Sequence, residues 1–238
     1  MSGLPAFSET LDGRVSRGLG GRFYGAYAAL VVDLADPEGQ GRVRIRLPWS
    51  PDPEEQNYEA WARVATLMAG NERGSWFVPD VDDEVLLVFE AGDVRRPYVV
   101  GALWNGQDSP PEQMDSASEN QVKTLRSRSG IVVTLDDSPG AERLHLETPG
   151  GRRVTLDDSG SSIEVNDGGG NVIKLEPSGI SITAAAKVKV EASTVEVSAG
   201  MVKVDAGISK FSGVVQADTV ITNSVVSSSY TPGAGNIW

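Results

Sequence analysis

The stretch KVKVEASTVEVSAGMVKVD, residues 187–205, decides the fold of the second half of the chain. It contains three Val-x-Val units at a spacing of seven residues: Val188 and Val190, Val195 and Val197, and Val202 and Val204. Alternation of apolar and polar residues is the period of a β-strand with one dry face. A coiled coil would instead need apolar residues three and four positions apart. The stretch therefore predicts very short strands joined by tight bends.

Strands this short leave an apolar face and two open edges without a partner. Burial of one valine contributes about 1.5–3 kcal/mol, whereas ordering each backbone residue costs about 1–2 kcal/mol. The polar residues between the valines carry this cost without the gain. We therefore expect the six valines to form a core only with copies of the same segment around a common axis.

Upstream of the valines the chain also repeats. VVTLDDS at Val132–Ser138 returns as RVTLDDS at Arg153–Ser159, and more alternating segments end at turns. These segments are Leu144–Gly151, Ile163–Gly170, Val172–Glu176 and Gly179–Thr183. Repetition of short strands is typical of an elongated, solenoid-like β-structure.

The first half of the chain is built differently, because it holds most of the large aromatic side chains. No Phe, Trp or Tyr occurs between Trp104 and Phe211. Five strands separated by turn residues are expected in the first half: Tyr27–Asp33, Gly41–Trp49, Trp61–Leu67, Asp83–Glu90 and Tyr98–Trp104. Five short antiparallel strands suit a small OB-type barrel, with Trp49 and Trp104 closing its ends.

Three sequence segments occur in order between residues 41 and 105: GRVRIRLPW, WARVATLMAGNERGSWFVPDVDDEVLLVFEAGD and RRPYVVGALWN. This region resembles the OB-fold domain of phage baseplate assembly protein V and of the VgrG spikes of type VI secretion. The residues that carry the resemblance are Arg42, Trp49, Trp61, Asp83, Glu84, Gly92, Asp93, Pro97, Gly101 and Asn105. Each also suits a packed scaffold, and none of them needs a catalytic role.

The resemblance implies an all-β homotrimer, with an OB-fold barrel followed by an elongated, intertwined β-helix needle. The expected parts are an N-terminal arm (1–24), the barrel (25–106), a linker (107–129), the triple-stranded spike (130–229) and a tip (230–238). Tyr230, Ile237 and Trp238 are expected to cap the trimer axis or to dock a PAAR-repeat tip protein. The linker is too short for an inserted lysozyme, and no VgrG hub domain precedes the barrel, so a separate hub protein is expected above it.

The implied function is that of the central spike in the baseplate of a contractile injection system, such as a phage tail, which leads penetration of the target envelope. The N-terminus lacks the apolar core of a signal peptide, and no apolar run approaches the length of a membrane span. We therefore expect synthesis and assembly in the cytoplasm. The absence of cysteine agrees with a reducing compartment.

Catalytic, metal and cofactor sites are not expected. The single histidine, His145, lies on an alternating strand and is interpreted as structural. Asp136/Asp137 and Asp157/Asp158 precede Ser at turns, where Asp satisfies backbone N–H groups. A glycan-cleaving enzyme that uses Asp157 is therefore a remote alternative, and weak calcium binding at these turns is left open.

The other alternative is an OB-fold module that binds sugar or single-stranded nucleic acid through Arg42, Arg44 and Arg46. The net charge of −12 opposes binding to a phosphate backbone, so no nucleic-acid partner is expected.

Overall fold

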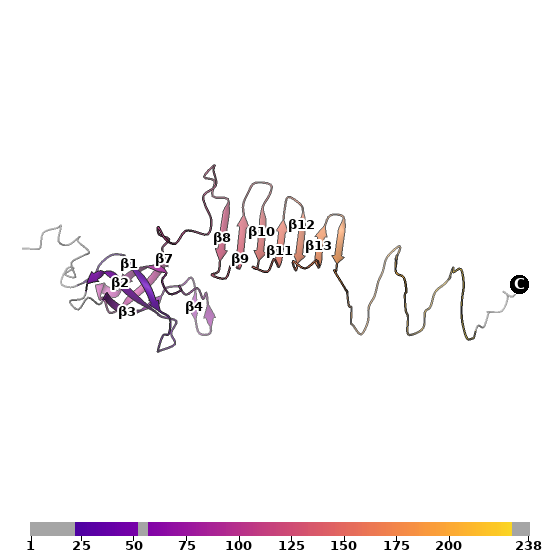
Figure 1. Ribbon diagram of the computed structural model, residues 1–238, viewed down its shortest axis with the longest axis horizontal. Helices are drawn as coiled ribbons and strands as arrows, with labels where there is room; N and C mark the ends of the chain where they lie inside the picture. Colours follow the sequence, from indigo (N-terminus) through magenta and orange to yellow (C-terminus); the bar gives the residue numbers. More distant parts are fainter. Residues whose placement is uncertain (1–21, 52–56, 230–238) are drawn as a thin grey trace, which may run out of the picture. The chain divides into compact units, whose positions relative to one another are not determined.

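The computed structural model describes residues 22–51 and 57–229, and their regular structure is almost entirely β (Figure 1). A single turn of 3₁₀-helix, η2 (Glu90–Gly92), is the exception in these two ranges. No helix in the described part is long and apolar enough to cross a membrane. The all-β class expected from the sequence is confirmed.

The first half folds as a closed five-stranded barrel with the neighbour order β1-β2-β3-β7-β6. Its strands are β1 (Tyr27–Asp33), β2 (Val43–Pro51), β3 (Asn57–Val64), β6 (Glu84–Phe89) and β7 (Pro97–Ala102). All five overlap the expected strands, although β3 begins four residues before the expected start at Trp61 and ends three before Leu67. The OB-like barrel is therefore confirmed.

One pairing in the barrel differs from the expectation of five antiparallel strands. β3 and β7 pair in parallel, with Arg63 opposite Tyr98 and Val64 opposite Val99. The reason is geometric: a closed ring with an odd number of strands cannot alternate direction at every neighbour. One parallel pair is needed to close five strands, so the all-antiparallel prediction was wrong at this pair.

The barrel core is formed by alternate side chains of its strands, as a period of two requires. The fully buried large residues are Ile45, Leu47, Leu87, Val31, Val43, Val85 and Val99. Between the third and fourth expected strands lies a small hairpin of β4 (Ala69–Gly70) and β5 (Arg73–Gly74). Trp76, two residues after β5, packs on Gly41. Gly41 has a φ of +70° and no room for a Cβ atom.

Aromatic side chains close one end of the barrel. Trp49 stacks on Tyr27, contacts Phe23, and donates a hydrogen bond from Nε1 to the carbonyl of Ala28 (2.8 Å). Trp104, in contrast, is 70% exposed because it follows the end of β7, so the prediction that it closes a barrel end was wrong. Phe23, which packs against Trp49, is buried although it lies two residues before the expected start of the barrel.

We predict that Phe23→Ala lowers the free energy of unfolding of the barrel by about 3–5 kcal/mol, because it removes a buried aromatic ring. Phe23 is 8% exposed and its backbone N–H donates to the carbonyl of Gly92 (2.9 Å). The neighbouring Tyr24→Ala is the control, since Tyr24 is 61% exposed, and it should change the free energy by only about 0.5 kcal/mol. Urea titration followed by tryptophan fluorescence measures both, and equal effects would contradict a core role for Phe23.

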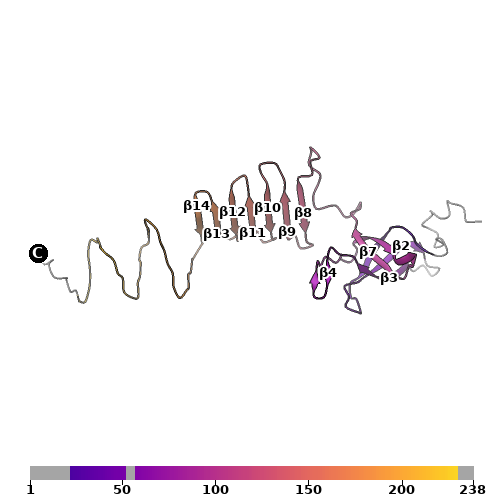
Figure 2. The same cartoon turned by 180° about the vertical axis from the view of Figure 1, so that it is seen from behind.

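The second part of the described chain is a seven-stranded sheet in which every strand pairs antiparallel with its neighbours in the sequence. The strands are β8 (Val122–Arg126), β9 (Val132–Asp136), β10 (Arg143–Glu147), β11 (Arg153–Asp157), β12 (Ser162–Asn166), β13 (Val172–Glu176) and β14 (Gly179–Thr183). Figure 2 shows them side by side as one layer. The sheet begins at Val122, inside the segment expected to be a linker, because β8 pairs with β9 along its full length.

Residues 184–229 contain no strand within one chain. The backbone there is extended and turns at regular bends, including Ser193, Gly200 and Gly207. From Val188 onward this segment forms a separate unit with few internal contacts. The short strands expected at the valines therefore have no pairing partner among the residues that the structure describes.

Candidate functional site

The register of the seven-stranded sheet separates its side chains into two faces. Because strand side chains alternate, residues directly opposite one another across the strands lie on the same face. Two of these cross-strand rows are apolar, and together we call them the apolar face: Leu125, Val133, Leu135, Leu144, Leu146, Val154, Leu156, Ile163, Val165, Ile173, Leu175, Ile180 and Ile182. Lys123 on the edge strand β8 is the only polar member of the two rows.

Nothing in the described chain covers the apolar face. Leu146 and Leu156, in the centre of the sheet, are 38% and 39% exposed, and Ile180 on the edge strand is 71% exposed. No residue of 104–229 is buried, whereas the barrel has a complete core. A contiguous apolar surface of this kind marks an interaction site.

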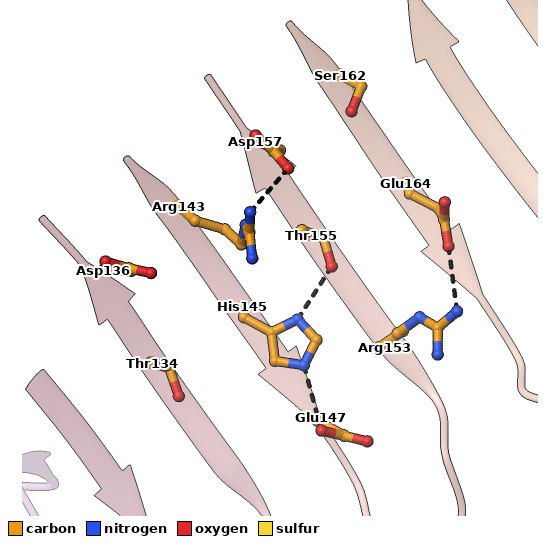
Figure 3. A pocket seen from close by; sticks show the side chains of 10 residues that line it. All are labelled: Thr134, Asp136, Arg143, His145, Glu147, Arg153, Thr155, Asp157, Ser162 and Glu164. Carbon is orange, nitrogen blue, oxygen red and sulfur yellow. Dashed lines mark hydrogen bonds and ion pairs between the residues drawn. The ribbon is translucent and has the colours of Figure 1, made fainter. Parts of the chain in front are cut away.

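The opposite face, which we call the polar face, carries charged and hydroxyl side chains over β9 to β12 (Figure 3). Arg143 pairs with Asp157 of β11 (3.2 Å), and Arg153 pairs with Glu164 of β12 (3.6 Å). Opposite charges on neighbouring strands support the sheet by about 0.2–1 kcal/mol per pair. Because it carries these ion pairs, the polar face is suited to exposure to solvent.

His145 lies at the centre of the polar face. Its Nδ1 lies 3.0 Å from the Thr155 hydroxyl and its Nε2 lies 3.2 Å from the Glu147 carboxylate, as Figure 3 shows. Both ring nitrogens thus have partners within the sheet, which agrees with the structural interpretation of this residue. Within the described ranges, no three His, Cys, Asp or Glu side chains are grouped so that they could hold a metal ion.

The two Asp pairs are parts of turns, as their sequence context predicts. Asp136 accepts hydrogen bonds from the hydroxyl (2.6 Å) and the backbone N–H (3.0 Å) of Ser138. Asp157 accepts from the Ser159 hydroxyl (2.6 Å) and the Gly160 N–H (3.0 Å). These hydrogen bonds give the Asp136 and Asp157 carboxylates a structural role at the turns.

The same hydrogen bonds predict a pH dependence. The Ser138 hydroxyl holds the pKa of Asp136 below its ordinary value, and the Ser159 hydroxyl does the same for the pKa of Asp157. A lowered pKa stabilises the fold above the unfolded-state pKa of about 3.9, and this contribution is lost as the pH falls below it. We expect the melting temperature of the full chain to fall between pH 5 and pH 2, and to fall less in the variant D136N/D157N. An equally steep fall in the variant would contradict this assignment.

The arginine row proposed for nucleic-acid binding is largely engaged within the barrel. Arg42 pairs with Asp36 (2.7 Å) and its guanidinium lies 5.8 Å from the Trp61 ring, while Arg44 pairs with Glu59 (2.6 Å). The Arg42 hydrogen bonds hold the pKa of Asp36 well below its usual range. Paired arginines are poorly placed to bind phosphate, so this alternative loses its main support.

The other residues of the OB-fold resemblance also have structural roles. Gly92 has a φ of +76°, which favours glycine, and Asp93 accepts from the Arg95 guanidinium (2.7 Å). Glu84 accepts from the Asn105 amide (2.8 Å). Asp83 lies just before β6 and accepts from the Asp80 N–H, Pro97 starts β7, and Gly101 of β7 lies opposite Leu86.

We call residues 187–205 the valine staircase, and its six valines are between 60% and 72% exposed in one chain. Their role in a trimer core is a prediction that a single chain does not test. Tyr230, Ile237 and Trp238 lie outside the described residues.

The sequence did not single out the apolar face as a site, because its thirteen residues come from seven strands. Their alternation was visible, but only the register shows that they form continuous rows.

Comparison with known proteins gives matches in both parts of the chain. The family described as the type VI secretion system/phage-baseplate injector OB domain matches residues 27–104. The family described as the phage baseplate V C-terminal trimerisation domain matches residues 143–208. The second match includes most of the apolar face and all six valines.

Relatives among curated proteins include spike proteins of type VI secretion systems and a toxin. The chain is 29% identical over 113 residues to the type VI secretion system spike protein VgrG1a of Pseudomonas aeruginosa, which covers 44% of this chain and 18% of the relative. It is 26% identical over 129 residues to the actin cross-linking toxin VgrG1 of Vibrio cholerae, which covers 49% of this chain and 12% of the relative. The chain thus spans less than a fifth of the length of either protein.

Proposed function

Since the chain belongs to the phage baseplate V/VgrG-like family of spike proteins, we propose that it forms a homotrimeric central spike in the baseplate of an injection system. The observation that carries this proposal is the apolar face, a continuous surface of thirteen side chains that no described residue of the same chain covers. The match of the trimerisation domain to residues 143–208 supports two further copies of the chain as that cover.

In the proposed trimer, three seven-stranded sheets turn their apolar faces toward a common axis and their polar faces toward water. Half-exposed Leu, Ile and Val side chains then become buried, at a gain of about 25 cal/mol for each Å² of apolar surface covered. The strands of each sheet pair within one chain, so each copy adds a preformed wall. Sheet assembly therefore needs no exchange of strands between the copies.

The valine staircase must assemble differently, because its expected strands have no partners within ranges 22–51 and 57–229 of their own chain. We infer that these strands pair between chains and wind around the axis, with Val188, Val190, Val195, Val197, Val202 and Val204 inside. Lys189, Glu196 and Lys203 then lie on the outer surface. A needle of this kind resists axial force, since the load is shared by the backbone hydrogen bonds of three chains.

The proposed action is mechanical rather than catalytic. The barrel is proposed to contact a separate hub protein, and the distal end to lead into the target envelope when the injection system fires. The tip at residues 230–238 is proposed to be closed by its own aromatic residues or by a PAAR-repeat protein. The polar face supports this assignment, because its carboxylates and its histidine are already engaged with neighbours in the sheet.

The mass of the purified full chain tests the proposal. One chain has a mass of 25.2 kDa, so a trimer should give 3 × 25.2 = 75.6 kDa in native mass spectrometry or light scattering. Negative-stain images should show a three-fold ring with a thin needle. A stable monomer at micromolar concentration would overturn the proposal.

A further inference from the structure

The outer surface of the needle changes its chemistry after Gly207. In the staircase each pair of valines encloses one charged residue: Lys189, Glu196 or Lys203. Since neighbouring side chains on an extended strand point to opposite faces, both valines of a unit share one face and the charge lies on the other. The staircase is therefore apolar on one face only.

Beyond Gly207 the apolar residues become direct neighbours in the sequence. The pairs are Val214 and Val215, Val220 and Ile221, and Val225 and Val226. On an extended backbone each pair must place one apolar side chain on each face, whichever face lies toward the axis. The bends also come closer together, since Asp218, Asn223 and Ser228 are five residues apart, whereas those at Ser193, Gly200 and Gly207 are seven apart. The segment 211–229 is thus apolar on both faces, and it lies outside the matched trimerisation domain.

Exposure in one chain distinguishes the two members of each pair. Val215, Val220 and Val225 are 62%, 73% and 66% exposed, close to the range of the staircase valines. Val214, Ile221 and Val226 are 97%, 95% and 98% exposed. The first set therefore matches the residues expected on the axis, and we call the second set the outer apolar residues.

Charge is nearly absent from the same segment. Asp218 is the single charged residue between positions 211 and 229, where the other polar residues are Ser, Thr, Asn and Gln. The staircase at 187–205 holds six charged residues: Lys187, Lys189, Glu191, Glu196, Lys203 and Asp205. An Asp, Lys or Arg at the centre of a bilayer costs about 2.5–3.5 kcal/mol, whereas Val or Ile gains about 0.3–0.6 kcal/mol.

We propose that residues 211–229 are the part of the needle that contacts lipid acyl chains, with Val214, Ile221 and Val226 as the contact residues. The inference rests on the proposed trimer, which supplies the backbone hydrogen bonds that a bilayer interior requires. An uncharged surface with an apolar side chain on every outer strand matches the acyl region. The charged outer surface of the staircase matches water.

The absence of cysteine allows a site-specific test on the full chain. I221C and K203C are each labelled with an environment-sensitive fluorophore and mixed with phosphatidylcholine vesicles. We expect the label at position 221 to shift to the blue and to brighten several-fold, while the label at 203 stays unchanged. No response at 221, or an equal response at 203, would overturn the proposal.

Two triple variants test which side chains lie outside. V214S/I221S/V226S should keep the mass of the trimer and its melting temperature within a few degrees, and should reduce flotation with the vesicles at least tenfold. V215S/V220S/V225S should lower the resistance of the segment to proteolysis. Dissociation by the first variant, or end-to-end association of wild-type trimers in place of vesicle binding, would overturn the lipid assignment. A wild-type monomer would instead contradict the proposed function itself.

Discussion

Leu156→Asp is expected to abolish the trimer. Leu156 lies on β11, between Leu144 and Ile163 of the neighbouring strands, near the middle of the apolar face. In the proposed trimer three copies of this carboxylate would lie together inside, without counter-charges. An uncompensated buried charge costs about 3–5 kcal/mol, and this cost would arise three times in one assembly. The mass of the variant in light scattering should fall from 75.6 kDa to that of one chain, 25.2 kDa.

Thr134→Asp is the matched control for this variant, because it adds the same charge to the polar face. Thr134 lies opposite His145 on the neighbouring strand, where a carboxylate stays in contact with water. This variant should keep the mass of the trimer. If Leu156→Asp also remained a trimer with an unchanged melting temperature, the apolar face would not be the interior of the assembly.

The barrel is the part that the sequence predicted in most detail. Its strands are predicted by the local alternation of apolar and polar residues and by the turn residues between them. The bounds of β1 were predicted as the structure has them. The parallel closure by β3 and β7 was missed because it is a property of the ring and not of any strand. Phe23 was assigned to the arm because its burial depends on ring contacts with Tyr27, at the start of β1, and with Trp49 and Phe89 on the more distant strands β2 and β6.

The candidate site was predicted less completely. The six valines were predicted to form a core because their spacing repeats within a short stretch of sequence. The apolar face extends over residues 125–182 and becomes visible only when each strand is set in register against the next. The apolar face and the valine staircase have the same physical origin. In each, alternating residues place apolar side chains on one face, and no described residue of the same chain covers that face. The alternation in the sequence predicts that another chain must cover these side chains. Which residues form the covered rows is known only from the register of the strands.

The second prediction with a large expected effect concerns the staircase. Val197→Asp should leave the mass of the trimer unchanged, because the sheets still associate, but should open the needle from residue 188 onward. This segment pairs with no described residue of its own chain, so its protection depends on pairing between chains and on burial of the valines. A loss of about 3 kcal/mol in local stability corresponds to a rise of roughly 100-fold in the open population, since 1.4 kcal/mol is a factor of ten.

Limited digestion by proteinase K, followed by mass spectrometry, measures that population, since cleavage of a transiently open segment tracks its equilibrium opening. In Val197→Asp the chain should be cut between residues 188 and 229 about 100-fold faster than in the wild type, while the barrel and the seven-stranded sheet survive. Glu196→Gln is the control, because its side chain lies on the opposite face of the same strand, and it should keep the wild-type rate. Equal resistance of Val197→Asp and the wild type would show that the valines do not face the axis. Rapid cleavage of both the wild type and the control would show that these strands gain no protection from the other chains.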